Sequence, residues 1–161
     1  MPAQAVVMVV DDDSEIRYTL TEALADEGYD VIATGSAEEA LSRLEEVLPD
    51  MMLIDIKMPQ MDGMALLEEA KKRDPNLTAI MLTGYGSVDS AVDAMRAGAF
   101  DFIEKPFRMN RLKVAIRKAL ENQSLRREVL RLRAEHRQRE GDIGSLIIGD
   151  SPAMKQIYRV I

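Results

Sequence analysis

Residues 5–17, AVVMVVDDDSEIR, decide the fold of this chain. The apolar run 5–10 has the length and the valine-rich composition of a buried strand. Three aspartates at 11–13 end the run, and Ser14 stands where a helix N-cap is expected. The next apolar residues recur at the spacing of one helix face: Ile16, Leu20, Ala23 and Leu24. The stretch therefore predicts a strand, a short acidic turn and a helix.

The same alternation continues along the chain. Further apolar runs of strand length occupy 29–34, 50–54, 78–82 and 100–104. Amphipathic stretches lie between them; Ser87 is placed as another N-cap, and Gly28 and Gly98 follow predicted helices. One such stretch carries a second apolar helix face: Val88, Ala91, Val92 and Met95. This pattern predicts an α/β fold, a parallel sheet of five strands covered by five helices.

The composition limits the classes of protein to which the chain can belong. Apolar residues make up 47% of the 161 residues, enough for a buried core. The absence of cysteine excludes a disulfide framework and a thiolate metal site. The N-terminus lacks the basic start of a secretory signal, and no apolar run approaches the roughly 18 residues of a membrane span. We therefore expect a soluble, cytoplasmic protein without membrane contact.

Charge is divided unevenly along the chain. Residues 1–107 hold 22 acidic and 8 basic residues, whereas residues 108–140 hold 11 basic and 4 acidic ones, which suggests a boundary near Phe107. Neither proline nor glycine occurs in 109–140, so one long helix should extend beyond the sheet domain until Gly141 stops it. Residues 144–161, GSLIIGDSPAMKQIYRVI, then have the pattern expected at the start of a new domain.

Polar residues follow the predicted strands, where ligands bind in doubly wound sheets. Neighbouring carboxylates repel one another unless a cation lies between them, and hard oxygen ligands favour Mg²⁺. A lysine and a threonine opposite them suit the oxygens of a phosphoryl group, and an aspartate can form an acyl phosphate. We take Asp55 as that nucleophile. The candidates are Asp11, Asp12 and Asp13 after the first strand, Asp55 after the third, Thr83 with Gly84 after the fourth, and Lys105 before Pro106 after the fifth.

Each of these signals also has an ordinary explanation. The aspartate run could be a solvated turn or a helix cap, and the Thr83 and Lys105 segments could be plain strand exits. A calcium loop with ligands at Asp11, Asp13, Glu15 and Glu22 is disfavoured because Ile16 stands where such a loop needs glycine. The joint placement of the acids, the hydroxyl and the ammonium group is what favours a functional site.

Four segments together resemble the receiver domain of bacterial two-component response regulators. They are VVDDDSEIR (9–17), LIDIKMPQMDG (53–63), MLTGYG (81–86) and GAFDFIEKPF (98–107). The resemblance implies a flavodoxin-like sheet of order 2-1-3-4-5 over about residues 4–122, with Asp55 as the phosphoacceptor. It implies that Asp11, Asp12, Asp55 and the backbone carbonyl of Lys57 hold Mg²⁺. It also implies that Thr83 and Lys105 bind the phosphoryl group and that Phe102 is the aromatic switch residue.

GAFDF, KPF and the trailing IIGDSPAMKQIYRVI are most similar to NtrC-type activators, which work with the sigma factor sigma-54. That resemblance implies a receiver domain at 1–122, a coiled-coil linker at 123–140 and the truncated start of an AAA+ ATPase at 141–161. It implies a sensor histidine kinase as phosphoryl donor. DNA and sigma-54 RNA polymerase would be reached only through domains outside this chain.

The resemblance implies a signalling switch that phosphorylation of Asp55 controls, and the residues leave two alternatives to this function open. A phosphatase or phosphotransferase of the haloacid-dehalogenase type also uses an aspartyl phosphate, but it usually has a second aspartate where this chain has Lys57. The other alternative is a receiver that is never phosphorylated and only dimerises. We expect the switch, which is a phosphoacceptor and not a turnover enzyme.

Three further predictions concern particular segments. The Lys105–Pro106 peptide should be cis. Neither Lys57 nor Tyr85 should orient the water that hydrolyses an acyl phosphate, and Tyr85 is bulky enough to obstruct it. The chain should form a homodimer through its long C-terminal helix. Two apolar seams would join the copies: Leu112, Ala115, Ala119 and Asn122, then Leu125, Val129, Leu132 and His136.

Overall fold

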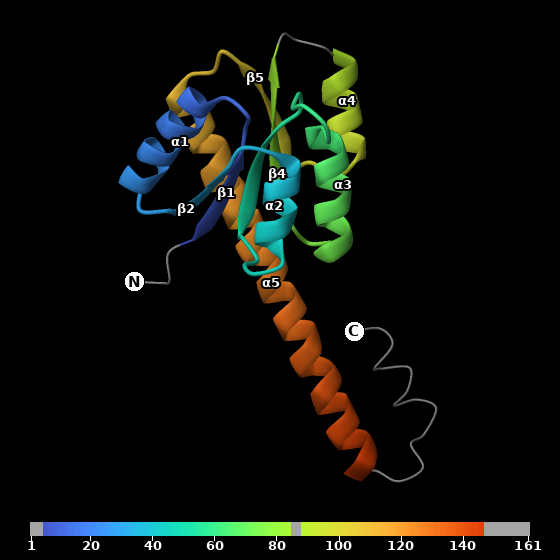
Figure 1. Ribbon diagram of the computed structural model, residues 1–161. Coiled ribbons are helices and arrows are strands. Elements are labelled where there is room, and N and C mark those ends of the chain that lie inside the picture. Colours follow the sequence, from blue (N-terminus) through green and yellow to red (C-terminus); the bar gives the residue numbers. More distant parts are fainter. Residues whose placement is uncertain (1–4, 85–87, 147–161) are drawn as a thin grey trace. The chain divides into compact units, whose positions relative to one another are not determined.

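The computed structural model describes residues 5–84 and 88–146 (Figure 1). Five parallel strands form one sheet of order β2-β1-β3-β4-β5, as predicted. The strands are β1 (Val6–Val10), β2 (Asp30–Thr34), β3 (Met51–Asp55), β4 (Thr78–Gly84) and β5 (Asp101–Lys105). The helices are α1 (Ser14–Asp26), α2 (Ala37–Leu44), α3 (Gly63–Arg73), α4 (Val88–Arg96) and α5 (Met109–Leu146).

The sheet separates two apolar cores because side chains alternate between its faces. Along β1, Met8 and Val10 enter the core beneath α2, α3 and α4, whereas Val7 and Val9 enter the core beneath α1 and α5. Figure 1 shows the same division of the helices between the two faces of the sheet. Since β3 is buried along its whole length, its run of apolar residues has no polar alternation.

The helix ends agree in part with the sequence signals. Gly28 and Gly98 lie in the left-handed region with φ of 91° and 100°, as expected of residues that follow helices. The N-cap of α1 is Asp13 and not Ser14, because the Asp13 side chain accepts from the N–H groups of Glu15 and Ile16. The predicted cap at Ser87 lies outside the described residues.

Helix α5 corrects two predictions. It continues through Gly141 and Gly144 to Leu146, since a glycine inside a helix costs only about 1 kcal/mol and need not end it. Leu112, Ala115 and Ala119 are buried in the core beneath the sheet, so they cannot form the first dimer seam. The spacing identified an apolar face correctly but could not tell whether the sheet or a second helix covers it.

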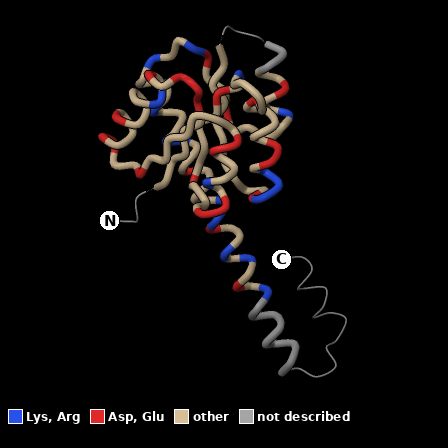
Figure 2. Tube along the Cα trace, viewed as in Figure 1, with Lys and Arg blue, Asp and Glu red and all other residues tan. Residues whose placement is uncertain are grey.

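The chain divides between Gln123 and Ser124 into two compact units, Met1–Gln123 and Ser124–Ile161. Acidic residues predominate in the first unit. Arg and Lys recur along the described part of α5, which extends from the first unit into the second (Figure 2). In the second, several large apolar side chains are exposed: Leu125, Val129, Leu130 and Leu132. None of the described helices is both long enough and apolar enough to cross a membrane.

Candidate functional site

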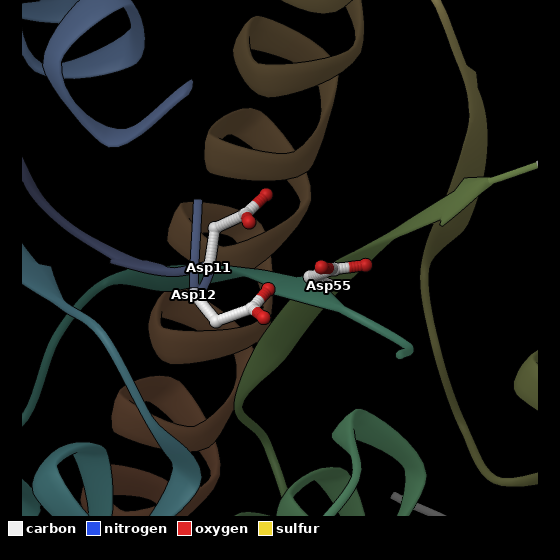
Figure 3. Close-up of side chains that lie close together, drawn as sticks. All are labelled: Asp11, Asp12 and Asp55. Carbon is white, nitrogen blue, oxygen red and sulfur yellow. The ribbon is translucent and has the colours of Figure 1, made fainter. Parts of the chain in front are cut away.

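Three carboxylates meet at the carboxyl end of the sheet. Asp11 directly follows β1, Asp12 is next to it, and Asp55 is the last residue of β3. Strands β1 and β3 are parallel neighbours, so residues that follow one lie beside the end of the other. One oxygen of each carboxylate lies within 4.8 Å of the others, and Figure 3 shows the three side chains gathered there. We name these three residues the acidic pocket.

Lys105, the last residue of β5, joins two of these acids. Its Nζ donates to Oδ2 of Asp11 at 2.8 Å and lies 3.4 Å from Oδ2 of Asp55. The side chain of Asp11 is fully buried and that of Asp55 nearly so. The Lys57 N–H donates to Oδ1 of Asp55 at 3.3 Å. An internal ammonium group therefore offsets part of the negative charge that the fold concentrates here.

That compensation is incomplete. Burial and the charge of Asp11 raise the pKa of Asp55 from 3.8 to about 6, although Lys105 and the Lys57 N–H oppose the rise. For Lys105, burial favours the neutral amine, but the hydrogen bond and charge of Asp11, with Asp55, outweigh it and raise its pKa. Lys105 thus stays charged, and the pocket still favours an additional cation.

The donor set fits a hard divalent cation. Carboxylate oxygens within 4.8 Å of one another suit Mg²⁺, which takes one or two carboxylates and keeps several waters. Asp12 is exposed and can present its carboxylate to a hydrated ion, whereas both oxygens of Asp11 already accept hydrogen bonds, from the Asp13 N–H and from Lys105. Asp12 and Asp55 are therefore better placed for direct ligation than Asp11.

The other predicted residues lie on neighbouring strands. Thr83 is buried near the end of β4, one residue beyond Leu82, which is the register partner of Asp55. Phe102 lies in β5 with 36% of its surface exposed, beside a surface pocket that Phe107 and Arg111 also line. The Lys105–Pro106 peptide is cis, as predicted. Tyr85 lies outside the described residues.

The sequence pattern did not single out two residues near the acidic pocket, Gly63 and Arg17. A Cβ at Gly63 would lie 2.1 Å from the backbone oxygen of Asp55, so only glycine fits there. Its N–H donates to the carbonyl of Ile56 at 2.8 Å, which ties the start of α3 to the strand that carries Asp55. Arg17 donates to the backbone carbonyl of Asp11 at 2.8 Å. Both residues stand in the quoted segments, but spacing alone gives no sign of these contacts.

Comparison with known proteins agrees with this geometry. The family model for the response regulator receiver domain matches residues 7–117. The chain is 37% identical over 158 residues to the DNA-binding transcriptional regulator NtrC of Escherichia coli K12, with 98% of the chain and 32% of that protein covered. It is 36% identical over 162 residues to the C4-dicarboxylate transport transcriptional regulatory protein DctD of Rhizobium meliloti, covering 100% of the chain and 35% of that protein.

Solved structures give the same result. The crystal structure of NtrX from Brucella abortus in complex with ADP superposes with a TM-score of 0.78 at 37% identity, covering 98% of the chain and 33% of that protein. A CheY-like receiver domain from Methanospirillum hungatei has a TM-score of 0.74 at 35% identity, covering 77% of the chain and 99% of that domain. The chain thus spans about a third of the length of NtrC and of DctD.

Proposed function

Because the chain belongs to the response regulator receiver domain family, we propose that it is a phosphorylation-controlled switch in which a sensor histidine kinase phosphorylates Asp55. The observation that carries this proposal is the position of the Asp55 carboxylate. It lies in the acidic pocket with Asp11 and Asp12, within 3.4 Å of the Lys105 ammonium group. This is the surrounding that a carboxylate needs to accept a phosphoryl group. The haloacid-dehalogenase alternative has no comparable support.

The transfer is an in-line displacement at phosphorus. An oxygen of Asp55 forms a bond to phosphorus, the bond from phosphorus to the kinase imidazole breaks, and the imidazole nitrogen keeps the electron pair. Lys105 lies beside Asp55, and Thr83 follows the register partner of Asp55 on the adjacent strand, so we assign both residues to the phosphoryl oxygens. Mg²⁺ held by Asp11, Asp12, Asp55 and the Lys57 carbonyl would neutralise charge on the transferring group.

The response begins with a change of charge. A phosphoryl group on Asp55 offers the Thr83 hydroxyl a new hydrogen-bond acceptor. Movement of Thr83 toward this acceptor would leave room beside β4. We assign Phe102 as the residue that turns into this room, because it lies on the adjacent strand with its ring partly in solvent. The surface formed by α4, β5 and the start of α5 would then change shape.

For the whole protein, we propose an NtrC-type activator. Its receiver would occupy residues 1–122, its linker 123–140 and the start of an AAA+ ATPase 141–161, the last largely outside the described residues. Sigma-54 RNA polymerase and DNA would be engaged by domains beyond this chain. The relatives NtrC and DctD are named as transcriptional regulators, which supports this assignment. The cytoplasmic location stays a prediction.

A homodimer through the linker part of α5 also stays a prediction. Its support is now limited to the second seam, where Leu125 is 66%, Val129 44% and Leu132 50% exposed. Pairing would bury this apolar surface, which a lone helix leaves in water. Truncation after Gln123 should lower the mass measured by light scattering from dimer to monomer. A full 161-residue chain that is monomeric at tens of micromolar would contradict the proposal.

The direct test of the switch is phosphorylation by a small donor. The protein is incubated with acetyl phosphate and Mg²⁺, and its intact mass is measured before and after. We expect one phosphoryl group on the protein, none on Asp55→Asn, and an unchanged yield on Asp30→Asn, which alters an exposed acid at the start of β2. A phosphorylated Asp55→Asn variant would refute the assignment, and an unmodified native protein would favour the receiver that only dimerises.

A further inference from the structure

Arg17 has no part in the chemistry described so far, yet it contacts the acidic pocket's backbone. It lies in the first turn of α1, and its Nη1 donates to the carbonyl of Asp11 at 2.8 Å. That carbonyl belongs to the peptide that joins Asp11 to Asp12. We propose that Arg17 is a positioning residue that fixes this peptide and thereby the direction in which Asp12 presents its carboxylate to Mg²⁺. The inference rests on the proposed function, because it takes the acidic pocket as a Mg²⁺ site.

Asp11 and Asp12 are held in very different ways. Asp11 is anchored at four points: its N–H donates to the Thr34 carbonyl at 3.2 Å, its carboxylate accepts from the Asp13 N–H and Lys105, and its carbonyl accepts from Arg17. Asp12 is exposed, and within the described part of the chain no donor holds its carboxylate. The direction of the Asp12 side chain therefore depends on its backbone, which Arg17 and the Asp11 anchors set.

The guanidinium group rests against a residue without a side chain. A Cβ at Gly35, just past β2, would lie 3.0 Å from Nη1 and 3.4 Å from Cζ of Arg17. Gly35 does not have a positive φ, so an alanine there meets no backbone strain. Its N–H donates to Oε2 of Glu39 at 3.1 Å. A Cβ at Gly35 would therefore require the Arg17 guanidinium group to shift by a few tenths of an ångström.

Geometry and charge predict opposite effects of Arg17 on the metal. A guanidinium group and Mg²⁺ are both cations, so by charge alone the loss of Arg17 should tighten Mg²⁺ binding. By geometry, the loss frees the Asp11–Asp12 peptide and should weaken binding. Outer-shell partners of metal ligands are typically worth about 10-fold to 100-fold in affinity. Lysine at position 17 keeps the positive charge but lacks the planar guanidinium group that lies between the Asp11 carbonyl and Gly35.

The test is a Mg²⁺ titration of the 161-residue protein without any phosphoryl donor, followed by ¹H–¹⁵N NMR. The variants are Arg17→Lys, Arg17→Gln and Gly35→Ala, the last of which displaces the guanidinium group without changing its charge. The matched control is Arg73→Lys, because Arg73 also donates to a backbone carbonyl, that of Leu41 at 3.0 Å, at the end of α3 and not at the acidic pocket. The amide resonance of Asp12 in metal-free protein is a second readout.

We expect both Arg17 variants to raise the dissociation constant of Mg²⁺ by about tenfold and Gly35→Ala to raise it by about threefold, with Arg73→Lys unchanged. The Asp12 resonance should shift in the first three variants. An Arg17→Lys dissociation constant within about twofold of the native one, or tighter binding by Arg17→Gln, would overturn the inference. If Arg17→Lys fails to fold, native affinity in Gly35→Ala overturns it. A native protein that does not bind Mg²⁺ refutes the metal site itself, which separates the two failures.

Discussion

Replacing Asp55 by asparagine should stabilise the metal-free protein at neutral pH. Asparagine has the same shape as aspartate and can still accept from the Lys57 N–H, but it carries no charge. In the native protein, burial and the neighbouring Asp11 raise the pKa of Asp55 from 3.8 to about 6. The folded state thus prefers the protonated acid, and ionisation of Asp55 costs stability.

The magnitude and the pH range follow from the shift. A rise of about two pKa units corresponds to about 3 kcal/mol, at about 1.36 kcal/mol per unit. When folding raises the pKa of an acid, that group contributes fully to the free energy of unfolding below its pKa in the unfolded state. The contribution is lost as pH rises through its pKa in the folded state. The native protein should therefore lose stability relative to Asp55→Asn between pH 3.8 and about 6. At pH 7.5 we expect the variant to be more stable by about 1–3 kcal/mol.

Urea denaturation followed by far-ultraviolet circular dichroism, with a chelator present, measures this difference at pH 4 and pH 7.5. The exposed control Asp30→Asn should show no comparable gain. Addition of Mg²⁺ at pH 7.5 should stabilise the native protein and not Asp55→Asn, which reduces the gap. Equal stability of the two proteins at pH 7.5 without metal would refute the electrostatic reasoning, and so would a gap of the same size at pH 4.

Three other expectations can be checked on the same protein. Gly63→Ala should lower stability by about 2 kcal/mol or more, because its Cβ would overlap the Asp55 backbone oxygen; a melting temperature equal to the native one would contradict this. Thr78→Val should cost about 1–2 kcal/mol by denaturant titration, since it removes the buried 2.6 Å hydrogen bond to Oε1 of Gln123. The acyl phosphate should last minutes or longer, because Lys57 and Tyr85 poorly orient an attacking water; decay within seconds in purified protein would count against this.

The strands were predictable because the sheet imposes its pattern directly on the sequence. Runs such as 50–54 are apolar without alternation since both faces of β3 are covered, and the structure shifts that strand by only one residue, to Met51–Asp55. The acidic pocket followed from the same logic: residues after neighbouring parallel strands meet at one edge. Asp11, Asp12, Asp55 and Lys105 were placed together on this ground alone, and the structure brings them together.

What the sequence could not supply is the partner of each face and the direction of each side chain. Leu112, Ala115 and Ala119 have the spacing that suits a coiled coil and equally suits packing on a sheet, and only the fold shows that the sheet covers them. In the sequence, nothing distinguishes Arg17 from any other arginine on a helix. Its contact with the Asp11 carbonyl depends on how the chain turns between β1 and α1. Contacts of this kind join side chain to backbone and leave no periodic trace.

Lys105 gives the acidic pocket a short route to helix α5. Its Nζ contacts both Asp11 and Asp55, so a change in the charge on Asp55 alters the forces on the end of β5. Only Pro106, Phe107 and Arg108 separate Lys105 from the start of α5 at Met109. The buried face of α5 is packed on the sheet up to Gln123, so this part of the helix has little freedom to rearrange alone. A change at Asp55 would therefore reach α5 as a shift of a packed element. Beyond Gln123, the apolar residues Leu125, Val129, Leu130 and Leu132 are exposed and thus open to another chain.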